Sequence, residues 1–243
     1  MGSFRALKIA ALTYYAAHLG VCRLNPNGTL DTTFNGSGRY FETRRSCAFD
    51  IATQWIDGEE RILISGNIDG SSSSYSKALL MRFTAAGSHD QSFGESGYAT
   101  GDYRPYRDGY GQMAVDSSNR IVVCWDADDF DSWEQPSGLV RHDPNGSLDA
   151  SFGTNGMLIP LPGGAAWEVR IEPGTPLRIL AGGLSESFMA VWRLTEDGVL
   201  DATFGTSGMS TTGAGGAGAK SLVLQSDGKF VALADGYLVR YWR

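Results

Sequence analysis

Residues Arg141 to Gly156 read RHDPNGSLDASFGTNG, and this pattern is written four times along the chain. In each copy an Arg is followed by Gly at the fifth place, Asp at the eighth and Phe at the eleventh. The other copies begin at Arg23, Arg82 and Arg193, and a further Arg strand, YLVRYWR, carries Arg240 near the end. Identical spacing in every copy indicates a structural repeat of roughly 40 to 60 residues.

Strand signals surround each copy. A basic residue opens a short apolar run before every Arg: KIAAL from Lys8, RILIS from Arg61, RIVVC from Arg120, RILAG from Arg178 and KFVAL from Lys229. Runs this short and this apolar predict strands buried on both faces. Further strands are expected before these runs at 48–55, 111–116, 166–172 and 220–225, and after the Phe-Gly segment at 39–43, 97–101, 156–160 and 208–212. Each repeat therefore predicts a four-stranded antiparallel meander.

Repeated four-stranded meanders predict an all-β protein with the β-propeller fold. We expect one domain over 1–243 with about five blades, at roughly 1–43, 44–100, 101–160, 161–211 and 212–243. The first and last repeats are one strand short, which gives 18 strands. Either five blades form with two incomplete ones, or an open fragment completes itself against another molecule, because unpaired edges favour association. A helix over 7–19 is the local alternative to the first strands.

The Arg and Asp of each repeat are expected to form an ion pair across the hairpin, or the Arg to bind the turn backbone. The pairs are Arg23 with Asp31, Arg82 with Asp90, Arg141 with Asp149, and Arg193 with Asp201. Phe34, Phe93, Phe152 and Phe204 would then pack between blades. The alternative is a ring of ligand-binding charges around a central channel. Because scaffolding preserves repeat symmetry, the identical spacing favours the structural role, including for Arg240.

The segments QSDGKFVALA from Gln225 and RHDPNGSLDASFGTNG from Arg141 resemble the delta-60 type repeat, a bacterial β-propeller repeat. The resemblance extends over essentially the whole chain, and the second repeat departs most, with TAAGSHD at its turn. It implies a secreted or cell-surface bacterial protein, and it brings no shared catalytic residues.

Composition argues against several classes of protein. The net charge is −7 without a basic cluster, which disfavours nucleic acid as a partner. No run approaches the roughly 18 apolar residues of a membrane span. The N-terminal stretch imitates a signal peptide, but Tyr14, Tyr15 and His18 interrupt its apolar region, so the localisation stays open. Cys22, Cys47 and Cys124 have no paired spacing, and buried free thiols are expected.

The loops of the second and third repeats differ most from the pattern. They contain Tyr103, Tyr106, Arg107, Tyr110, Trp125, Asp128, Asp131 and Trp133. Aromatic rings, arginine and carboxylates suit stacking on, and hydrogen bonding to, a glycan or protein surface. The alternative is a set of exposed loops whose rings pack onto blade edges. Calcium at Asp126–Asp131 is a further hypothesis, although the EF-hand pattern is not met and no cofactor is predicted.

Catalytic signatures are scarce. Gly213 to Ser221, GAGGAGAKS, almost matches a phosphate loop, but a strand rather than a helix is expected after it. The histidines are His18, His89 and His142, and none of them has a neighbouring nucleophile in the sequence. His89 stands where the other repeats have a Leu. The prediction is a non-enzymatic binding or scaffold protein. The alternatives are a propeller-type lyase or hydrolase at the central channel, and a structural module that oligomerises through its incomplete terminal blades instead of staying monomeric.

Overall fold

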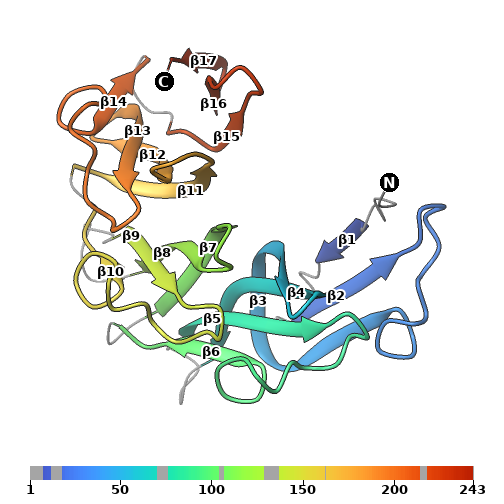
Figure 1. The fold of residues 1–243 in the computed structure, drawn as a ribbon. Helices are drawn as coiled ribbons and strands as arrows, with labels where there is room; N and C mark the ends of the chain where they lie inside the picture. Colours follow the sequence, from blue (N-terminus) through green and yellow to red (C-terminus); the bar gives the residue numbers. More distant parts are fainter. Residues whose placement is uncertain are drawn as a thin grey trace. The chain divides into compact units, whose positions relative to one another are not determined.

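The computed structural model describes residues 8–11, 18–69, 76–103, 107–128, 137–161, 163–213 and 218–242. These residues form 17 β-strands and no helix (Figure 1). Within them, therefore, nothing helical is long and apolar enough to cross a membrane. The chain divides into two compact units, Met1–Tyr110 and Gly111–Arg243. One closed domain over 1–243 stays a prediction.

The first compact unit holds the strands of the first two repeats. They are β1 (Lys8–Ala11), β2 (His18–Leu24), β3 (Arg39–Ile56), β4 (Glu59–Asp69), β5 (Ser76–Thr84) and β6 (Tyr98–Gly101). Each pairs antiparallel with the next. The long β3 joins two predicted strands, 39–43 and 48–55, which explains why 17 strands are found where 18 were expected. The helical alternative is wrong for residues 8–11 and 18–19, which are extended.

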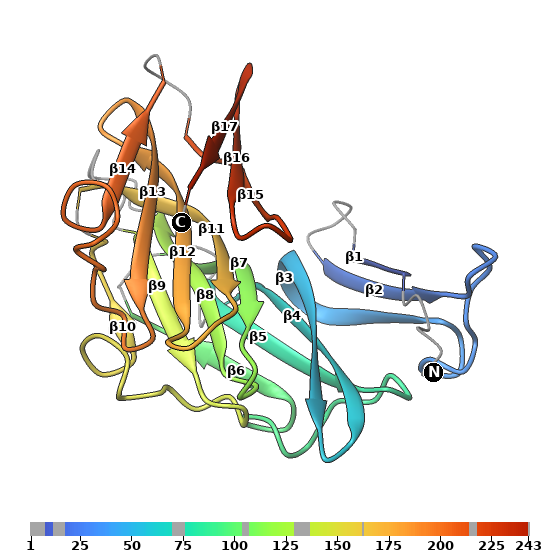
Figure 2. The same ribbon diagram turned by 45° about the horizontal axis from the view of Figure 1, so that its top comes forward.

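The second compact unit holds the other repeats as successive meanders. The third repeat has β7 (Arg107–Val115), which begins in the first unit, with β8 (Ile121–Asp128), β9 (Ser137–His142) and β10 (Met157–Leu158). The fourth has β11 (Ala165–Glu172), β12 (Arg178–Ser185), β13 (Phe188–Thr195) and β14 (Met209–Thr212). The fifth has β15 (Ser221–Leu224), β16 (Phe230–Ala234) and β17 (Tyr237–Tyr241), drawn in red in Figure 2. The predicted strand order is confirmed.

Strand β12 explains why the central strands are apolar throughout. Alternate side chains of a strand point to opposite faces of the sheet. Ile179 joins a buried cluster with Phe152 of the third repeat, whereas Leu180 joins one with Phe230 of the fifth. Both faces of the fourth-repeat sheet are therefore covered by neighbouring repeats, as its continuous apolar run predicted.

The first compact unit is built in the same way. Leu19 of β2 and Ile62 of β4 share a buried cluster with Phe34 of the first repeat and Phe83 of the second. The rings of Phe34 and Phe83 lie 6.1 Å apart between centroids. The motif Phe therefore packs between consecutive repeats.

The three cysteines are free thiols with different exposure. Cys124 is buried, as expected. Cys22 and Cys47 are only partly buried, so the expectation of a buried thiol is wrong at these two positions. In β2, Cys22 lies between the buried Val21 and Arg23, so its side chain points to the opposite face of the sheet.

Candidate functional site

The Arg and Asp of the motif form an ion pair in all four repeats. The Nε–Oδ2 distances are 2.8 Å for Arg23–Asp31, 3.0 Å for Arg82–Asp90, 2.7 Å for Arg141–Asp149 and 3.1 Å for Arg193–Asp201. A hydroxyl two residues after each Asp accepts a second bond from the same guanidinium, as Ser151 does from Arg141 at 2.9 Å. Each guanidinium also lies 4.5 to 5.2 Å from the ring centroid of its motif Phe. Ion pair, hydroxyl and ring together fix the corner after the hairpin.

A tight turn follows each motif Arg, and we call it the connecting turn. The four connecting turns are Asn25–Gly28, Thr84–Gly87, Asp143–Gly146 and Thr195–Gly198. Each closes with the Gly N–H donating to the carbonyl of its first residue, at 2.9 to 3.1 Å. The backbone of these turns is therefore alike in all four repeats.

The connecting turn of the fourth repeat docks onto the third repeat. Nη1 of Arg141 donates to the carbonyl oxygen of Glu196, and the N–H of Gly153 donates to that of Asp197 at 2.9 Å. Nη2 of Arg120 contacts the Glu196 carboxylate at 2.6 Å. The turn is thus held through its backbone by the motif arginine and through its acidic side chain by the arginine that precedes β8.

The first two repeats use the same contact. Nη1 of Arg23 donates to the carbonyl of Ala85, and the N–H of Asn35 donates to that of Ala86 at 2.7 Å. Phe34 lies against Gly87, where a Cβ would come within 2.8 Å of the ring. In the first and third repeats, the motif residues therefore form a receptor for the connecting turn of the next repeat.

Replacing Gly198 with alanine should destabilise the protein more than the same change at Gly28. Both glycines have positive φ, +80° and +85°, so the backbone strain of alanine is shared. At Gly198 the new Cβ would lie 2.7 Å from the Phe152 ring, whereas at Gly28 nothing lies within 4 Å. We expect a difference of about 1–3 kcal/mol in the free energy of unfolding, measured by urea denaturation. If both variants lost the same free energy of unfolding, the contact between the connecting turn and the Phe152 ring would be contradicted.

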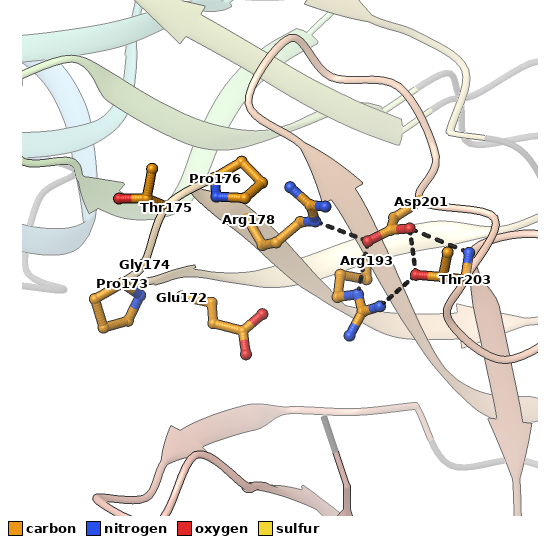
Figure 3. Close-up of a pocket in the computed structure, with 9 residues that line it drawn as sticks. All are labelled: Glu172, Pro173, Gly174, Thr175, Pro176, Arg178, Arg193, Asp201 and Thr203. Atoms are coloured by element: carbon orange, nitrogen blue, oxygen red, sulfur yellow. Dashed lines mark hydrogen bonds and ion pairs between the residues drawn. The ribbon is translucent and has the colours of Figure 1, made fainter.

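In the fourth repeat the corresponding receptor is open. A cavity of about 330 Å³ is lined by Glu172, Pro173, Gly174, Thr175, Pro176, Arg178, Arg193, Asp201 and Thr203. We call it the fourth-repeat socket, and Figure 3 shows both guanidinium groups directed at one carboxylate. The loop between β11 and β12 forms one wall, and the corner after β13 forms the other.

Two arginines share a single carboxylate in the socket. Nε of Arg178 lies 2.7 Å and Nε of Arg193 lies 3.1 Å from Oδ2 of Asp201. The Thr203 hydroxyl and the Arg178 guanidinium hold the pKa of Asp201 well below its usual range. Asp201 therefore stays ionised, and it orients both guanidinium groups.

Each of these arginines keeps an uncommitted donor. Nη1 of Arg193 and Nη2 of Arg178 meet no hydrogen-bond acceptor among the residues that the structure describes. In the third repeat, the group equivalent to Nη1 of Arg193 binds a turn carbonyl, and Arg120 binds a carboxylate. The socket can therefore accept a carbonyl oxygen and an acidic side chain. In the described parts of the chain, no cluster of three or more His, Cys, Asp or Glu could hold a metal ion.

The loop residues predicted to bind a ligand are only partly described. Tyr103 is half-buried, and its hydroxyl shares a hydrogen bond with that of Tyr110. Tyr110 is 0% and Trp125 is 1% exposed. The expectation that these two rings face a surface ligand is therefore wrong, because both are packed into the core.

The other predicted loop residues give no geometry for a site. Tyr106, Asp131 and Trp133 lie outside the described residues, and so do residues 129–131, half of the stretch Asp126–Asp131 proposed for calcium. Arg107 and Asp128 are described only as backbone positions of β7 and β8. Binding by these side chains stays a prediction.

A second polar cluster lies in the first compact unit, where two repeats depart from the pattern. Nε2 of His89 lies 3.0 Å from the Tyr40 hydroxyl and 3.1 Å from that of Tyr98. Both hydroxyls donate to Glu42, which Arg44 also binds. Burial alone would raise the pKa of Glu42, but these donors lower it to about 2. Since both hydroxyls donate to Glu42, they can accept only from a protonated Nε2 of His89, which leaves the buried Nδ1 without a hydrogen-bond partner among the described residues.

Sequence reasoning found the motif arginine and aspartate of the socket but missed the other participants. The signal for Arg178 was present, because a basic residue opens the corresponding strand in every repeat. The signal for the turn was its acidic residue, Glu196, at the third place after Arg193. Neither pattern says which receptor is occupied, since that depends on contacts between repeats.

The sequence matches the profile of a family described as "domain of unknown function (DUF5122) beta-propeller" at residues 12–34 and 178–204. No curated protein matches the chain. Both matched segments contain the motif Arg, its connecting turn, the Asp and the Phe, which are the parts that dock between repeats. The match and the antiparallel meanders together support a β-propeller repeat family for this chain.

Proposed function

We propose that the chain is a non-enzymatic binding module of the β-propeller type, built from about five blades, whose protein ligand inserts a tight acidic turn into the fourth-repeat socket. One observation carries the proposal. The equivalent receptor of the third repeat is filled by Glu196–Gly198, with its carbonyl on Arg141 and its carboxylate on Arg120. The open socket presents the same chemistry through Arg193 and Arg178.

The position of Arg178 adds support. In the filled receptor Arg120 reaches out to Glu196, at 2.6 Å. In the open socket Arg178 instead turns toward Asp201, at 2.7 Å. An incoming carboxylate would compete for the guanidinium of Arg178, whose side chain is 26% exposed, and Asp201 would keep Arg193 as its partner. Charge-assisted hydrogen bonds of this kind are short and directional.

A cyclised peptide with the sequence Thr195–Leu200 is the probe for this function, and calorimetric titration is the measurement. We expect saturable binding that weakens at least tenfold, about 1.4 kcal/mol, in Arg178→Met. Replacing the peptide glutamate with glutamine should have a similar effect on the unaltered protein and none on Arg178→Met, because both changes remove the same contact. The matched control is Arg45→Met, whose side chain is 57% exposed and remote in sequence from the socket.

A second experiment distinguishes a protein ligand from a glycan ligand. A glycan array probed with the unaltered chain and with Arg178→Met tests the loops of the second and third repeats. A glycan that binds both proteins equally, while the peptide binds neither, would overturn the socket as the functional site.

A further inference from the structure

The corner after the hairpin of the first repeat differs from the other three at one residue. Asn35 stands where the other repeats have a glycine, which is Gly94, Gly153 or Gly205. The φ angle is alike at all four positions, +49° at Asn35 and +51° to +53° at the glycines. Asparagine is among the few residues with a side chain that are enriched in this left-handed region. The first repeat thus keeps the backbone direction of the corner and adds a side chain to it.

The added side chain changes the hydrogen bonds of the corner. In the other three repeats the N–H after the glycine donates to the carbonyl three residues later, as Glu95 does to Tyr98 at 2.7 Å. A Cβ on any of those glycines would come within 2.0 to 2.3 Å of a carbonyl oxygen of the corner, so a side chain does not fit there. In the first repeat, Nδ2 of Asn35 instead donates to the carbonyl of Arg39 at 2.8 Å. The N–H of Gly36 consequently meets no hydrogen-bond acceptor among the residues that the structure describes.

A free N–H beside an asparagine side chain permits a reaction within the chain. The backbone nitrogen of Gly36 can attack Cγ of Asn35 and form a cyclic succinimide. The bond from Cγ to Nδ2 breaks, and the side-chain nitrogen leaves as ammonia with the proton of the attacking N–H. Water then opens the ring at either carbonyl and gives aspartate or isoaspartate, without any oxidant or reductant. Both residues are exposed, and a Cβ on Gly36 would meet nothing within 4 Å, so the ring has room and water has access.

The chain has three more Asn-Gly pairs, and hydrogen bonds protect each of them. Their glycine N–H groups donate to carbonyls of the same turn at 2.9 Å, from Gly28, Gly146 and Gly156. In two of the pairs the asparagine Oδ1 also accepts a hydroxyl at 2.7 Å, at Asn27 and Asn145. The glycine nitrogen of these pairs must lose its hydrogen bond before it can attack, which raises the barrier.

We propose that Asn35 is a deamidation site of the folded protein, and that isoaspartate at this position loosens the docking of the second repeat onto the first. The N–H of Asn35 donates to the carbonyl of Ala86, in the connecting turn of the second repeat, at 2.7 Å. Isoaspartate adds a methylene to the backbone at the corner and so displaces this donor. Either product also replaces the Nδ2 donor with a carboxylate, which repels the carbonyl oxygen of Arg39. The inference is independent of the fourth-repeat socket.

The test is a comparison of reaction rates at the four Asn-Gly pairs in mildly alkaline buffer. Peptide mapping by mass spectrometry would follow deamidation in the folded full chain and in the same chain unfolded in urea. In the folded chain we expect Asn35 to react at least about tenfold faster than Asn27, Asn145 or Asn155. In urea we expect the four rates to lie close together, because no turn then holds a glycine N–H.

Amide hydrogen exchange at Gly87 measures the effect on docking. The N–H of Gly87 closes the connecting turn by donating to the carbonyl of Thr84 at 2.9 Å. After incubation, exchange at Gly87 should be faster in the unaltered chain and unchanged in Asn35→Gly, the matched control. That variant restores the residue of the other repeats and removes the reactive amide. Asn35→Asp, which has the carboxylate without the added methylene, should show a smaller increase.

Three results would contradict the inference. A folded-state rate at Asn35 no greater than that at Asn155 would overturn the modification site. Deamidation of Asn35 that leaves exchange at Gly87 unchanged would overturn its effect on docking. Faster exchange at Gly87 in incubated Asn35→Gly would show that another change loosens the turn.

Discussion

Replacing Arg141 with methionine should lower the free energy of unfolding by about 3–5 kcal/mol. The side chain of Arg141 is 1% exposed, and its guanidinium binds Asp149, Ser151 and the carbonyl of Glu196. Methionine would fill much of the volume but leave the Asp149 carboxylate, which is 11% exposed, without its cation. Uncompensated burial of a charge costs more than the ion pair itself contributes.

Urea denaturation of Arg141→Met and Arg240→Met provides the comparison. Arg240 occupies the same place in the fifth repeat, but its side chain is 50% exposed, and its partner Asp227 is 43% exposed. Solvent screens such a pair, so the midpoint for Arg240→Met should stay close to that of the unaltered chain. Equal shifts in the two variants would mean that burial and docking do not distinguish the third repeat from the fifth.

Replacing His142 with leucine should remove a large part of the acid sensitivity of the protein. His142 is 3% exposed, and its Nδ1 donates to the carbonyl of Gly146 at 2.9 Å. Burial lowers its pKa to about 4, and the Gly146 carbonyl and Asp143 only partly oppose that shift. Because the unfolded state binds the proton more readily, stability falls as the pH drops below about 6.5 and levels off near pH 4.

The size of the effect follows from the shift. A histidine pKa of about 4 when folded and 6.5 when unfolded corresponds to about 3 kcal/mol between neutral pH and pH 4. Leucine is the natural replacement, since Leu24 and Leu194 occupy the same place in the first and fourth repeats. Stability measured from pH 7.5 to pH 4 should therefore fall less steeply in His142→Leu.

The remaining slope has an identifiable source. Burial also lowers the pKa of His89 from its usual value of 6.5, so protonation of His89 destabilises the protein in the same direction as the pH falls below that value. The motif aspartates act at lower pH, because their folded pKa values lie below 3.8, and their contribution is lost as the pH falls beneath that value. A slope between pH 6.5 and pH 4 that is unchanged in His142→Leu would show that His142 is not the group responsible.

The candidate site could be predicted from the sequence only in part. The eight-residue spacing of Arg193 and Asp201 is local, and it predicts the ion pair because one hairpin brings the two residues together. The aromatic loop of the third repeat misled the prediction at Trp125. A tryptophan at the end of an apolar run in the sequence can point into the core or out toward solvent, and Trp125 is 1% exposed.

By itself the sequence determined the repeat, the strand order of each meander and the ion pair at each corner. These features depend on residues close together in the chain, where alternating apolar positions and turn residues leave few conformations. Only the tertiary structure decided which receptors are filled. Arg141 meets a carbonyl 55 residues away, whereas Arg193 faces a cavity, although the two arginines stand in the same motif. Occupancy depends on the packing of one repeat against the next, and identical motifs cannot encode that difference.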